Sequence, residues 1–324
     1  MIKAVRIHDF GGAENLTYED VDIGAPGAGD VLLRHAVVGL NYVDIGMRAG
    51  QYPVKPPLPF TLGMEAMGVV EAIGPGVSGF NAGDRVSHCM VPGAYAEKMV
   101  IKADRLISIP DDIPDETAAA ATLQGLTAEY LLRSCYEVQP GDTILVQAAA
   151  GGMGLLLCQW AKQLGATVLG TVSTDEKAEI AAAHGCDHPI NYKSEDFVAR
   201  VANITNGAGV KAVYDAVGKD TFDGGMAALG VRGHMVSYGN SSGRVPPVDL
   251  TPLGAKSLTI TRGALGVYVA DPVDRARRAN DLWAMIAGGH LKVEINQRYA
   301  LADAAQAHAD LEGRKTTGST ILMP

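Results

Sequence analysis

The chain of 324 residues has few aromatic side chains, few charges and very little cysteine. Aromatic residues make up 6% and charged residues 19%, whereas 47% are hydrophobic, so the chain can bury a large core and is not disordered. Acidic residues outnumber basic ones, 36 against 27, which leaves a formal charge of −9. A surface of this sign repels phosphate backbones and anionic lipids. The composition therefore disfavours nucleic acids and membranes as partners and favours a small molecule.

Cysteine usage narrows the class of protein further. The four cysteines are scattered and no pair has CxxC spacing, which argues against a disulfide framework and against a zinc knuckle. No uninterrupted apolar run is long enough to cross a bilayer, and the segment Met1–His8 lacks the apolar core and cleavage site of a signal peptide. We expect a reduced, cytoplasmic protein, and at ~100–200 residues per domain the length predicts two domains.

The character of the sequence changes near the alanine-rich stretch at residues 117–121. Before it, short apolar segments such as Ala4–Ile7 and Val31–Val37 are bounded by Gly and Pro turns, which predicts a compact, mostly β region. After it, strand-like and helix-like segments alternate, as is typical of a parallel sheet covered on both faces by helices. The expected helices are 152–164, 175–184, 196–204, 221–229 and 272–287, and the expected strands are 143–147, 167–172, 189–191, 210–214, 234–238, 258–261 and 321–323.

The strongest local motif is a small-residue loop between a strand and a helix. It reads Ala149-Ala150-Gly151-Gly152-Met153-Gly154, which is GxGxxG with Ala in place of the first Gly. Small residues let the turn tighten and let the backbone approach a pyrophosphate, while the amides at the helix N-terminus supply donors. We expect Gly151, Gly152, Met153 and Gly154 to bind a dinucleotide. A merely tight strand-to-helix turn is the alternative.

The end of the second strand indicates which dinucleotide is bound. An NAD site expects Asp or Glu there, because a carboxylate holds both ribose hydroxyls. Here Ser173 and Thr174 follow the strand, and Lys177 lies one helical turn further on. Hydroxyls and an ammonium group suit a 2′-phosphate, so the cofactor is predicted to be NADPH. Asp175 and Glu176 complicate this reading unless they cap the helix and point away, and Lys177 is alternatively an ordinary solvated residue.

Six stretches of the chain carry a family resemblance when they are taken together. They are Asn41–Asp44, Arg48–Pro53, Gln124–Thr127, Gly141–Leu145, Ala149–Gly154 (with Gln159 and Lys162) and Val236–Gly243. In this combination they resemble the zinc-free, zeta-crystallin-like quinone oxidoreductases of the medium-chain dehydrogenase/reductase superfamily. The resemblance implies an α/β protein in three segments. These are a GroES-like, mostly β catalytic domain over 1–123, a Rossmann NADP-binding domain with a doubly wound parallel sheet over 124–262, and a C-terminal return to the catalytic domain over 263–324.

The chain departs from the zinc alcohol dehydrogenases of the same superfamily. Those enzymes carry a Cys ligand where Asn41 sits and a His ligand where Met64 sits. An amide and a thioether are poor Zn²⁺ ligands beside a thiolate and an imidazole. Only Cys89 occurs in the region where a structural zinc would need four cysteines. We therefore expect no metal, and hydride delivery to an acceptor that is already electrophilic.

The resemblance also implies which residues form the site. Asn41 would orient the nicotinamide or the substrate, and the hydroxyl of Tyr42 or Tyr52 would donate a proton or hydrogen bond as charge builds on a quinone oxygen. Each tyrosine is alternatively a wall residue only. The implied cofactor-binding residues are Asn41, Thr127, Gly151, Gly152, Met153, Gly154, Ser173, Thr174, Lys177, Tyr192, Tyr238, Gly239, Asn240 and Arg314.

Three positions near the implied catalytic residues lead to further expectations. Asp44 and Glu65 are expected to be structural acids rather than catalysts. Similar proteins often carry Tyr where this chain has Gly46, which predicts a roomier pocket.

The favoured activity is NADPH-dependent reduction of a quinone. The alternatives are reduction of α,β-unsaturated carbonyls, and a non-catalytic role like that of the crystallin or RNA-binding relatives, although the acidic charge argues against RNA. The segment Leu258–Thr261 is rich in β-branched residues and carries no charge, which predicts an open sheet edge through which a homodimer forms. Coverage of this edge by the C-terminal helices is the alternative.

Overall fold

The computed structural model describes residues 1–52 and 55–324, so Pro53, which ends the Arg48–Pro53 stretch, lies outside the described residues. The chain forms two compact units. Unit 1 comprises Met1–Leu126, Val269–Ala287 and Val293–Pro324, and unit 2 comprises Thr127–Tyr268 and Gly288–Lys292. From the sequence we predicted domain boundaries at 123/124 and 262/263. The assignment of catalysis and cofactor binding to the segments between these boundaries stays a prediction. None of the helices in the described ranges is both long and apolar enough to cross a membrane.

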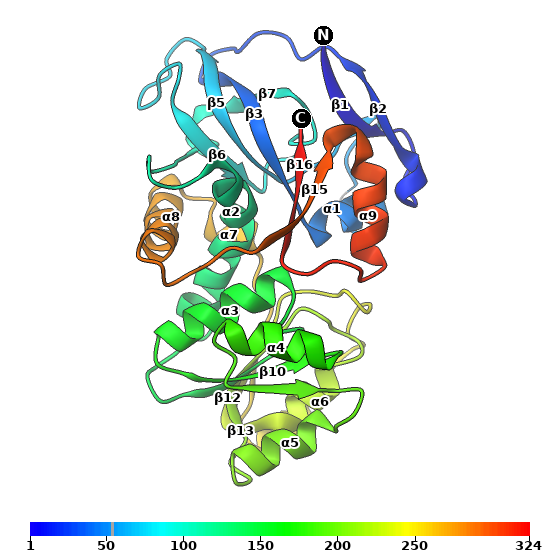
Figure 1. The fold of residues 1–324 in the computed structure, drawn as a ribbon, viewed down its shortest axis with the longest axis vertical. Helices are drawn as coiled ribbons and strands as arrows, with labels where there is room; N and C mark the ends of the chain where they lie inside the picture. The colour runs from blue at the N-terminus through cyan, green and yellow to red at the C-terminus, as the bar shows by residue number, and fades with distance from the viewer. Residues whose placement is uncertain (53–54) are drawn as a thin grey trace. The chain divides into compact units, whose positions relative to one another are not determined.

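Unit 1 is built mainly from two β-sheets (Figure 1). The larger has the strand order β15-β16-β3-β5-β6-β8, with β7 paired to β3, and the smaller has the order β2-β1-β4. The strands are β1 (Ile2–Ile7), β2 (Leu16–Val21), β3 (Asp30–Leu40), β4 (Phe60–Thr61), β5 (Glu65–Ile73), β6 (Arg85–Cys89), β7 (Lys98–Lys102), β8 (Ile107–Ser108), β15 (Ile295–Ala300) and β16 (Ser319–Met323). The helices are α1 (Tyr42–Arg48), α2 (Asp115–Tyr130, which ends in unit 2), α8 (Pro272–Ala287) and α9 (Ala304–Glu312). The late strand β16 lies between β15 and β3.

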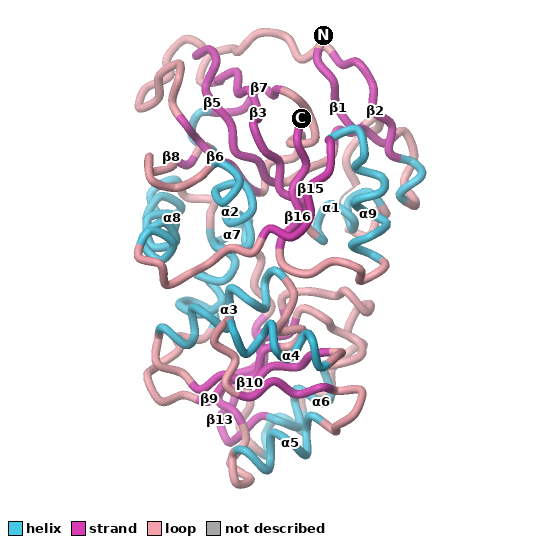
Figure 2. Tube along the Cα trace, in the orientation of Figure 1, coloured by secondary structure: helices cyan, strands magenta, loops and turns pink. Residues whose placement is uncertain are grey.

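Unit 2 is a six-stranded parallel sheet with helices on both faces, so the predicted doubly wound α/β fold is confirmed. Figures 1 and 2 show α3 and α4 on one face of the sheet and α5 and α6 on the other. The strand order is β11 (His188–Asn191), β10 (Thr167–Val172), β9 (Thr143–Val146), β12 (Val210–Asp215), β13 (Leu229–Ser237) and β14 (Thr259–Thr261). The helices are α3 (Gly152–Gln163), α4 (Asp175–Ala183), α5 (Phe197–Ile204), α6 (Phe222–Ala228) and α7 (Leu265–Tyr268).

Two local differences from the expected elements have clear causes. The helix expected from residue 196 begins one residue later, because the Asp196 carboxylate caps it by accepting the backbone N–H groups of Val198 (2.8 Å) and Ala199 (3.3 Å). The short helix α1 was not expected at all. A capping box starts it, in which the Asp44 carboxylate accepts the backbone N–H of Asn41 at 2.9 Å.

A pair of histidines is buried in unit 1. His35 and His88 are 4% and 0% exposed, and their Nε2 atoms are 3.4 Å apart. Nδ1 of His35 lies 2.7 Å from the carbonyl oxygen of Ala96, so it carries the proton of the neutral ring. Burial lowers the pKa of His35 to about 4, and burial together with the His35 ring lowers the pKa of His88.

This burial makes the stability of unit 1 sensitive to acid. The unfolded chain takes up a proton on His35 near pH 6.5, whereas the folded chain resists protonation until about pH 4. The contribution of His35 is therefore complete above pH 6.5 and is lost as the pH falls through this window. Between pH 7 and pH 5 we expect the wild type to lose about 2 kcal/mol of unfolding free energy relative to a His35→Gln variant.

Urea denaturation can follow unit 1 alone. The two tryptophans lie in different units, Trp283 in unit 1 and Trp160 in unit 2, so a Trp160→Phe background leaves Trp283 fluorescence as the reporter. Unfolding free energies that change equally with pH in wild type and His35→Gln would contradict the prediction.

Candidate functional site

The glycine loop of unit 2 presents the N-terminus of α3. Gly151 is the N-cap residue, and as a glycine it has no side chain with which to cap the helix. A Cβ on Gly154 would collide with the carbonyl oxygen of Ala148 and lie 2.7 Å from Ala149, so only glycine allows the loop to fold back this closely. Ala149 in turn donates its N–H to Thr171 of β10 at 2.9 Å. The first amides of α3 are thereby available to an anion, and the positive end of the helix dipole favours one.

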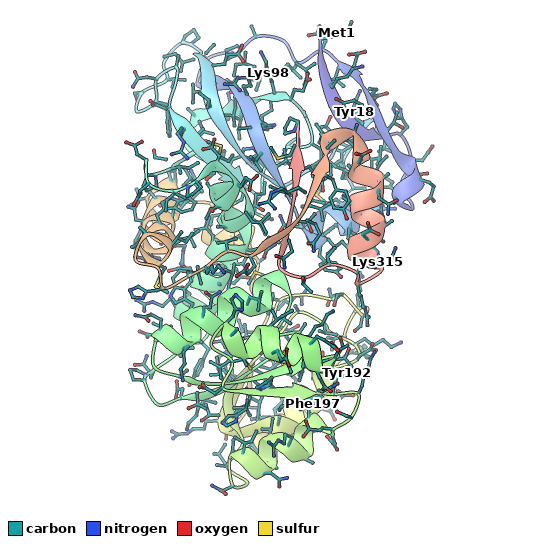
Figure 3. All side chains as sticks on the ribbon, viewed as in Figure 1. Met1, Tyr18, Lys98, Tyr192, Phe197 and Lys315 are labelled. Carbon is teal, nitrogen blue, oxygen red and sulfur yellow. The ribbon has the colours of Figure 1, made fainter. Side chains whose placement is uncertain are left out.

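The end of β10 brings together four of the residues predicted to bind the cofactor. Tyr192 donates its backbone N–H to Val172 at 3.1 Å, which places it beside Ser173 where β10 and β11 end. Lys177 lies in the first turn of α4, which is capped by the Thr174 hydroxyl at 3.2 Å from the Lys177 amide. Tyr192 is 44% exposed and is labelled in Figure 3. The ammonium group of Lys177 forms no ion pair within residues 1–52 and 55–324.

The two acids in this segment are already engaged. The Asp175 carboxylate accepts from the side chain of Asn191 at 2.8 Å. Hydrogen bonds from the Glu176 backbone N–H and from the Thr174 hydroxyl lower the pKa of the Glu176 carboxyl, which holds it at the start of α4. The Ser173 hydroxyl and the Lys177 ammonium therefore remain as available polar groups at the end of β10, while the Thr174 hydroxyl is used by the cap of α4.

The carboxyl edge of the same sheet carries three buried polar groups without a hydrogen-bond partner among the described residues. They are Nε2 of Gln147 after β9, Oδ2 of Asp215 at the end of β12, and the hydroxyl of Tyr238 after β13. Burial raises the pKa of Asp215, while the hydroxyl of Thr221 and two backbone N–H groups stabilise its charged form. Ligands of open α/β sheets bind at this edge.

Gln147 and Asp215 were missed by the analysis of the sequence. The signal that was present is their place directly at the ends of predicted parallel strands. Tyr238 and Gly239 were predicted, and Arg262 holds their loop by donating to Ser237 Oγ and the Gly239 carbonyl, both at 3.0 Å. Asn240 follows them in this loop. Thr127, which is 8% exposed, lies near the end of α2 in unit 2.

The predicted catalytic residues belong to unit 1, where β3 passes into α1. Asn41 is buried at 5% exposure, and its side-chain Nδ2 donates to Glu65 Oε2 at 2.7 Å. Its Oδ1 accepts from Gln124 Nε2 at 3.1 Å. Burial raises the pKa of Asp44 to about 7 and that of Glu65 to about 8. The N–H groups that donate to both carboxyls act in the opposite direction and lower these pKa values. Both acids are buried, as expected of structural acids.

The two predicted tyrosines lie on α1 or against it, and both are partly exposed. The Tyr42 hydroxyl donates to the Leu311 carbonyl at 3.2 Å. Burial raises the pKa of Tyr42, and the nearby positive charge of Arg314 partly offsets this. The Tyr52 ring lies over Gly46, since a Cβ there would be 2.8 Å from the ring. The Tyr52 ring therefore fills the space that a side chain at position 46 would take. The pocket is roomier, as expected from Gly46, only when this ring moves aside.

The donor set of this region does not suit zinc. Asn41 is committed to Glu65 and Gln124, and the Met64 thioether is not among the Cys, His, Asp and Glu ligands that bind zinc in proteins. Within the described ranges, no three His, Cys, Asp or Glu side chains gather as a ligand set.

Comparison with known proteins extends over the whole chain. Residues 27–111 match the alcohol dehydrogenase GroES-like domain family, and residues 152–282 match the zinc-binding dehydrogenase family. A quinone oxidoreductase from Pseudomonas aeruginosa is 46% identical, with 100% of both chains covered. A 2-haloacrylate reductase from a Burkholderia species is 42% identical over 100% of this chain and 99% of that protein. The crystal structure of Escherichia coli quinone oxidoreductase complexed with NADPH has a TM-score of 0.96 at 43% identity, covering 99% of this chain and 100% of that chain.

Proposed function

The chain belongs to the quinone oxidoreductase family of the medium-chain dehydrogenase/reductase superfamily, and on that premise we propose that it reduces quinones with NADPH. The observation that carries the cofactor choice is the end of β10, where Ser173, Lys177 and Tyr192 gather and the neighbouring acids are engaged elsewhere. A relative of this family has been crystallised with NADPH. Reduction of activated alkenes is the second candidate activity, because a 2-haloacrylate reductase is 42% identical over the full chain.

The residues of unit 2 would bind and orient the cofactor, which supplies the hydride. The amides of Gly152, Met153 and Gly154 would hold the pyrophosphate at the start of α3. Ser173, Thr174, Lys177 and Tyr192 would hold the adenosine end with its 2′-phosphate. Tyr238, Gly239, Asn240 and Thr127 are proposed for the nicotinamide half. The Tyr238 hydroxyl, which has no hydrogen-bond partner in the described part of the chain, supports a polar contact there.

The residues of unit 1 would act on the substrate and on parts of the cofactor. Asn41 would orient the nicotinamide or the substrate, and Arg314 would contact a phosphate or ribose oxygen. As hydride reaches a quinone, negative charge develops on its oxygen, and a hydroxyl that donates to it stabilises the transition state. Tyr42 and Tyr52 are 48% and 45% exposed, so both rings are accessible, and the Tyr42 hydroxyl would exchange the Leu311 carbonyl for the substrate oxygen.

An absorbance assay tests the activity. Purified protein is mixed with NADPH or NADH and a panel of quinones and enals, and loss of the reduced nicotinamide absorbance is followed. We expect oxidation of NADPH with at least one quinone, whereas no oxidation with any acceptor would refute the proposal. Because Asn41 and Met64 are poor zinc ligands, prolonged chelation is expected to leave the rate unchanged. A rate lost on chelation and restored by zinc would refute the zinc-free reading.

We also propose a cytoplasmic homodimer. In the sheet of unit 2, β14 has a strand neighbour on one side only among the described residues, and Thr259 on it is exposed. Pairing of two such edges about a two-fold axis would remove the open edge. Light scattering should return twice the chain mass, and a monomer at every working concentration would refute the dimer.

The cytoplasmic location is supported by the cysteines. All four are buried and form no disulfide within the described ranges, as expected in a reducing compartment.

A further inference from the structure

The side-chain amide of Asn41 is held at both of its ends. Nδ2 donates to the Glu65 carboxyl at 2.7 Å, and Oδ1 accepts from Gln124 Nε2 at 3.1 Å. Turning the amide by half a turn would set its oxygen against the Glu65 oxygen and its N–H groups against those of Gln124. The two neighbours therefore allow one orientation only.

Glu65 is itself fixed from several sides. It is 1% exposed, and its second oxygen, Oε1, accepts the backbone N–H of Leu123. A Cβ on residue 39 would collide with Oε2, so Gly39 leaves room for this carboxyl. Because N–H donors meet both oxygens, position 65 requires a side chain that accepts at both ends.

Gln124 is oriented in the same way. Its Oε1 accepts from the Ser319 hydroxyl at 3.4 Å, which turns Nε2 toward Asn41. The hydrogen bonds run in one direction, from Ser319 through Gln124 and Asn41 to Glu65. Segments of α2, β3, β5 and β16 thus fix a single amide group in unit 1.

We propose that Glu65 and Gln124 are positioning residues that lock the Asn41 amide in one orientation for the reaction. An amide nitrogen carries two N–H groups, and Glu65 takes one of them, so the other is presented as a donor of fixed direction. The proposal rests on the proposed function, in which Asn41 contacts the nicotinamide or the substrate. Glu65 acts through Asn41 and need not touch either.

Glu65→Gln tests the lock with a side chain of the same size. Glutamine accepts at one end and donates at the other, so one of the two N–H groups facing position 65 loses its acceptor and Asn41 is no longer confined. We expect kcat to fall about 10-fold or more, because one buried N–H group is left facing another donor instead of an acceptor. The Kd for NADPH should change much less than kcat, because the residues proposed to hold the adenosine end of the cofactor lie in unit 2.

Glu71→Gln is the matched control. Glu71 lies on the same strand, β5, but at the surface, where it pairs with Lys98 at 2.7 Å. We expect this variant to keep the wild-type kcat. Gln124→Met removes the other half of the lock and should lower kcat in the same direction, about 3-fold to 10-fold. If the melting temperature of Glu65→Gln shows that this variant does not fold, Gln124→Met is used to test the proposal instead.

A double-mutant cycle separates positioning from general damage. If Glu65 acts through Asn41, Glu65→Gln should lower kcat in the wild type and leave it unchanged in an Asn41→Ala background. An equal loss in both backgrounds, or no loss in the wild type, would overturn the proposal. The outcome is distinct from failure of the proposed function, which would show as no NADPH oxidation by the wild type with any acceptor.

Discussion

Replacing Arg48 with methionine is expected to lower the unfolding free energy of unit 1 by about 2–4 kcal/mol, because hydrogen-bond acceptors inside the unit lose their donor. The side chain of Arg48 is 2% exposed, and each part of its guanidinium is used. Nε donates to the Gly11 carbonyl at 3.1 Å, Nη1 to His308 Nδ1 at 3.1 Å, and Nη2 to Glu312 at 2.8 Å. Methionine fills much of the same volume but leaves the buried Nδ1 of His308 and the half-buried carbonyl of Gly11 without a donor. An unsatisfied buried acceptor costs ~1–3 kcal/mol.

The effect extends through a chain of polar groups. With Nδ1 accepting from Arg48, His308 uses Nε2 to donate to the Tyr95 hydroxyl at 2.9 Å, and Tyr95 donates to Asp44 at 3.3 Å. Burial and the Arg48 charge lower the pKa of His308 to about 3, so the ring is neutral. Loss of Arg48 therefore loosens the contacts between α1 and α9 within unit 1.

Urea denaturation with Trp283 as reporter measures this loss. The Trp283 indole donates to the Ser108 carbonyl at 3.1 Å, which ties its fluorescence to the folded state of unit 1. Arg277→Met is the control, because Arg277 is 50% exposed in ion pairs with Asp274 and Asp281 on α8. Its loss should cost ~0–1 kcal/mol. If Arg48→Met cost no more than the control, the buried network would not contribute as argued.

Replacing Lys177 with alanine is expected to weaken NADPH binding by about 10–100-fold and to leave NADH binding nearly unchanged. A charge-assisted contact to a phosphate contributes roughly 1.5–3 kcal/mol, and 1.4 kcal/mol is tenfold in affinity. Only NADPH carries the 2′-phosphate that Lys177 would contact. Ser173→Asp should lower the preference further, because its carboxylate would repel that phosphate.

Dissociation constants for both cofactors decide this prediction. Lys211→Ala is the matched control, because Lys211 is exposed near the start of β12, at the amino end of the parallel sheet. It should change neither constant. Equal binding of NADH and NADPH by the wild type would remove the basis for the prediction, and an equal weakening of both by Lys177→Ala would show that the contact is not with the 2′-phosphate.

The sequence was most informative where structure is local. Alternating apolar segments predicted the parallel sheet of unit 2, and the small residues before Gly154 predicted a loop that the backbone geometry requires. The sequence did not show whether the acids beside Lys177 would repel a 2′-phosphate. In the structure Asp175 accepts a hydrogen bond from Asn191, which lies 16 positions away. Such a pairing follows from the β10–β11 register, which the sequence alone does not provide.

The buried networks of unit 1 were beyond prediction for the same reason. Arg48 and His308 are 260 positions apart, and Asn41 and Gln124 are 83 apart. Glu65 was expected to be a buried structural acid and is buried, but its partners could not be predicted. Long-range contacts of this kind depend on how sheets and helices pack, which periodicity and motif spacing do not specify.

The position of β16 has a consequence for how the protein is made. Residues 319–323 fill the place between β15 and β3 in the larger sheet of unit 1, whereas unit 2 has all of its segments by Lys292. Because domains fold as units during synthesis, unit 2 can complete its sheet on the ribosome while unit 1 still lacks this strand. The N-terminal strands, although translated first, must then wait for a late one, so ribosome-bound chains would carry an incomplete unit 1 that chaperones can recognise.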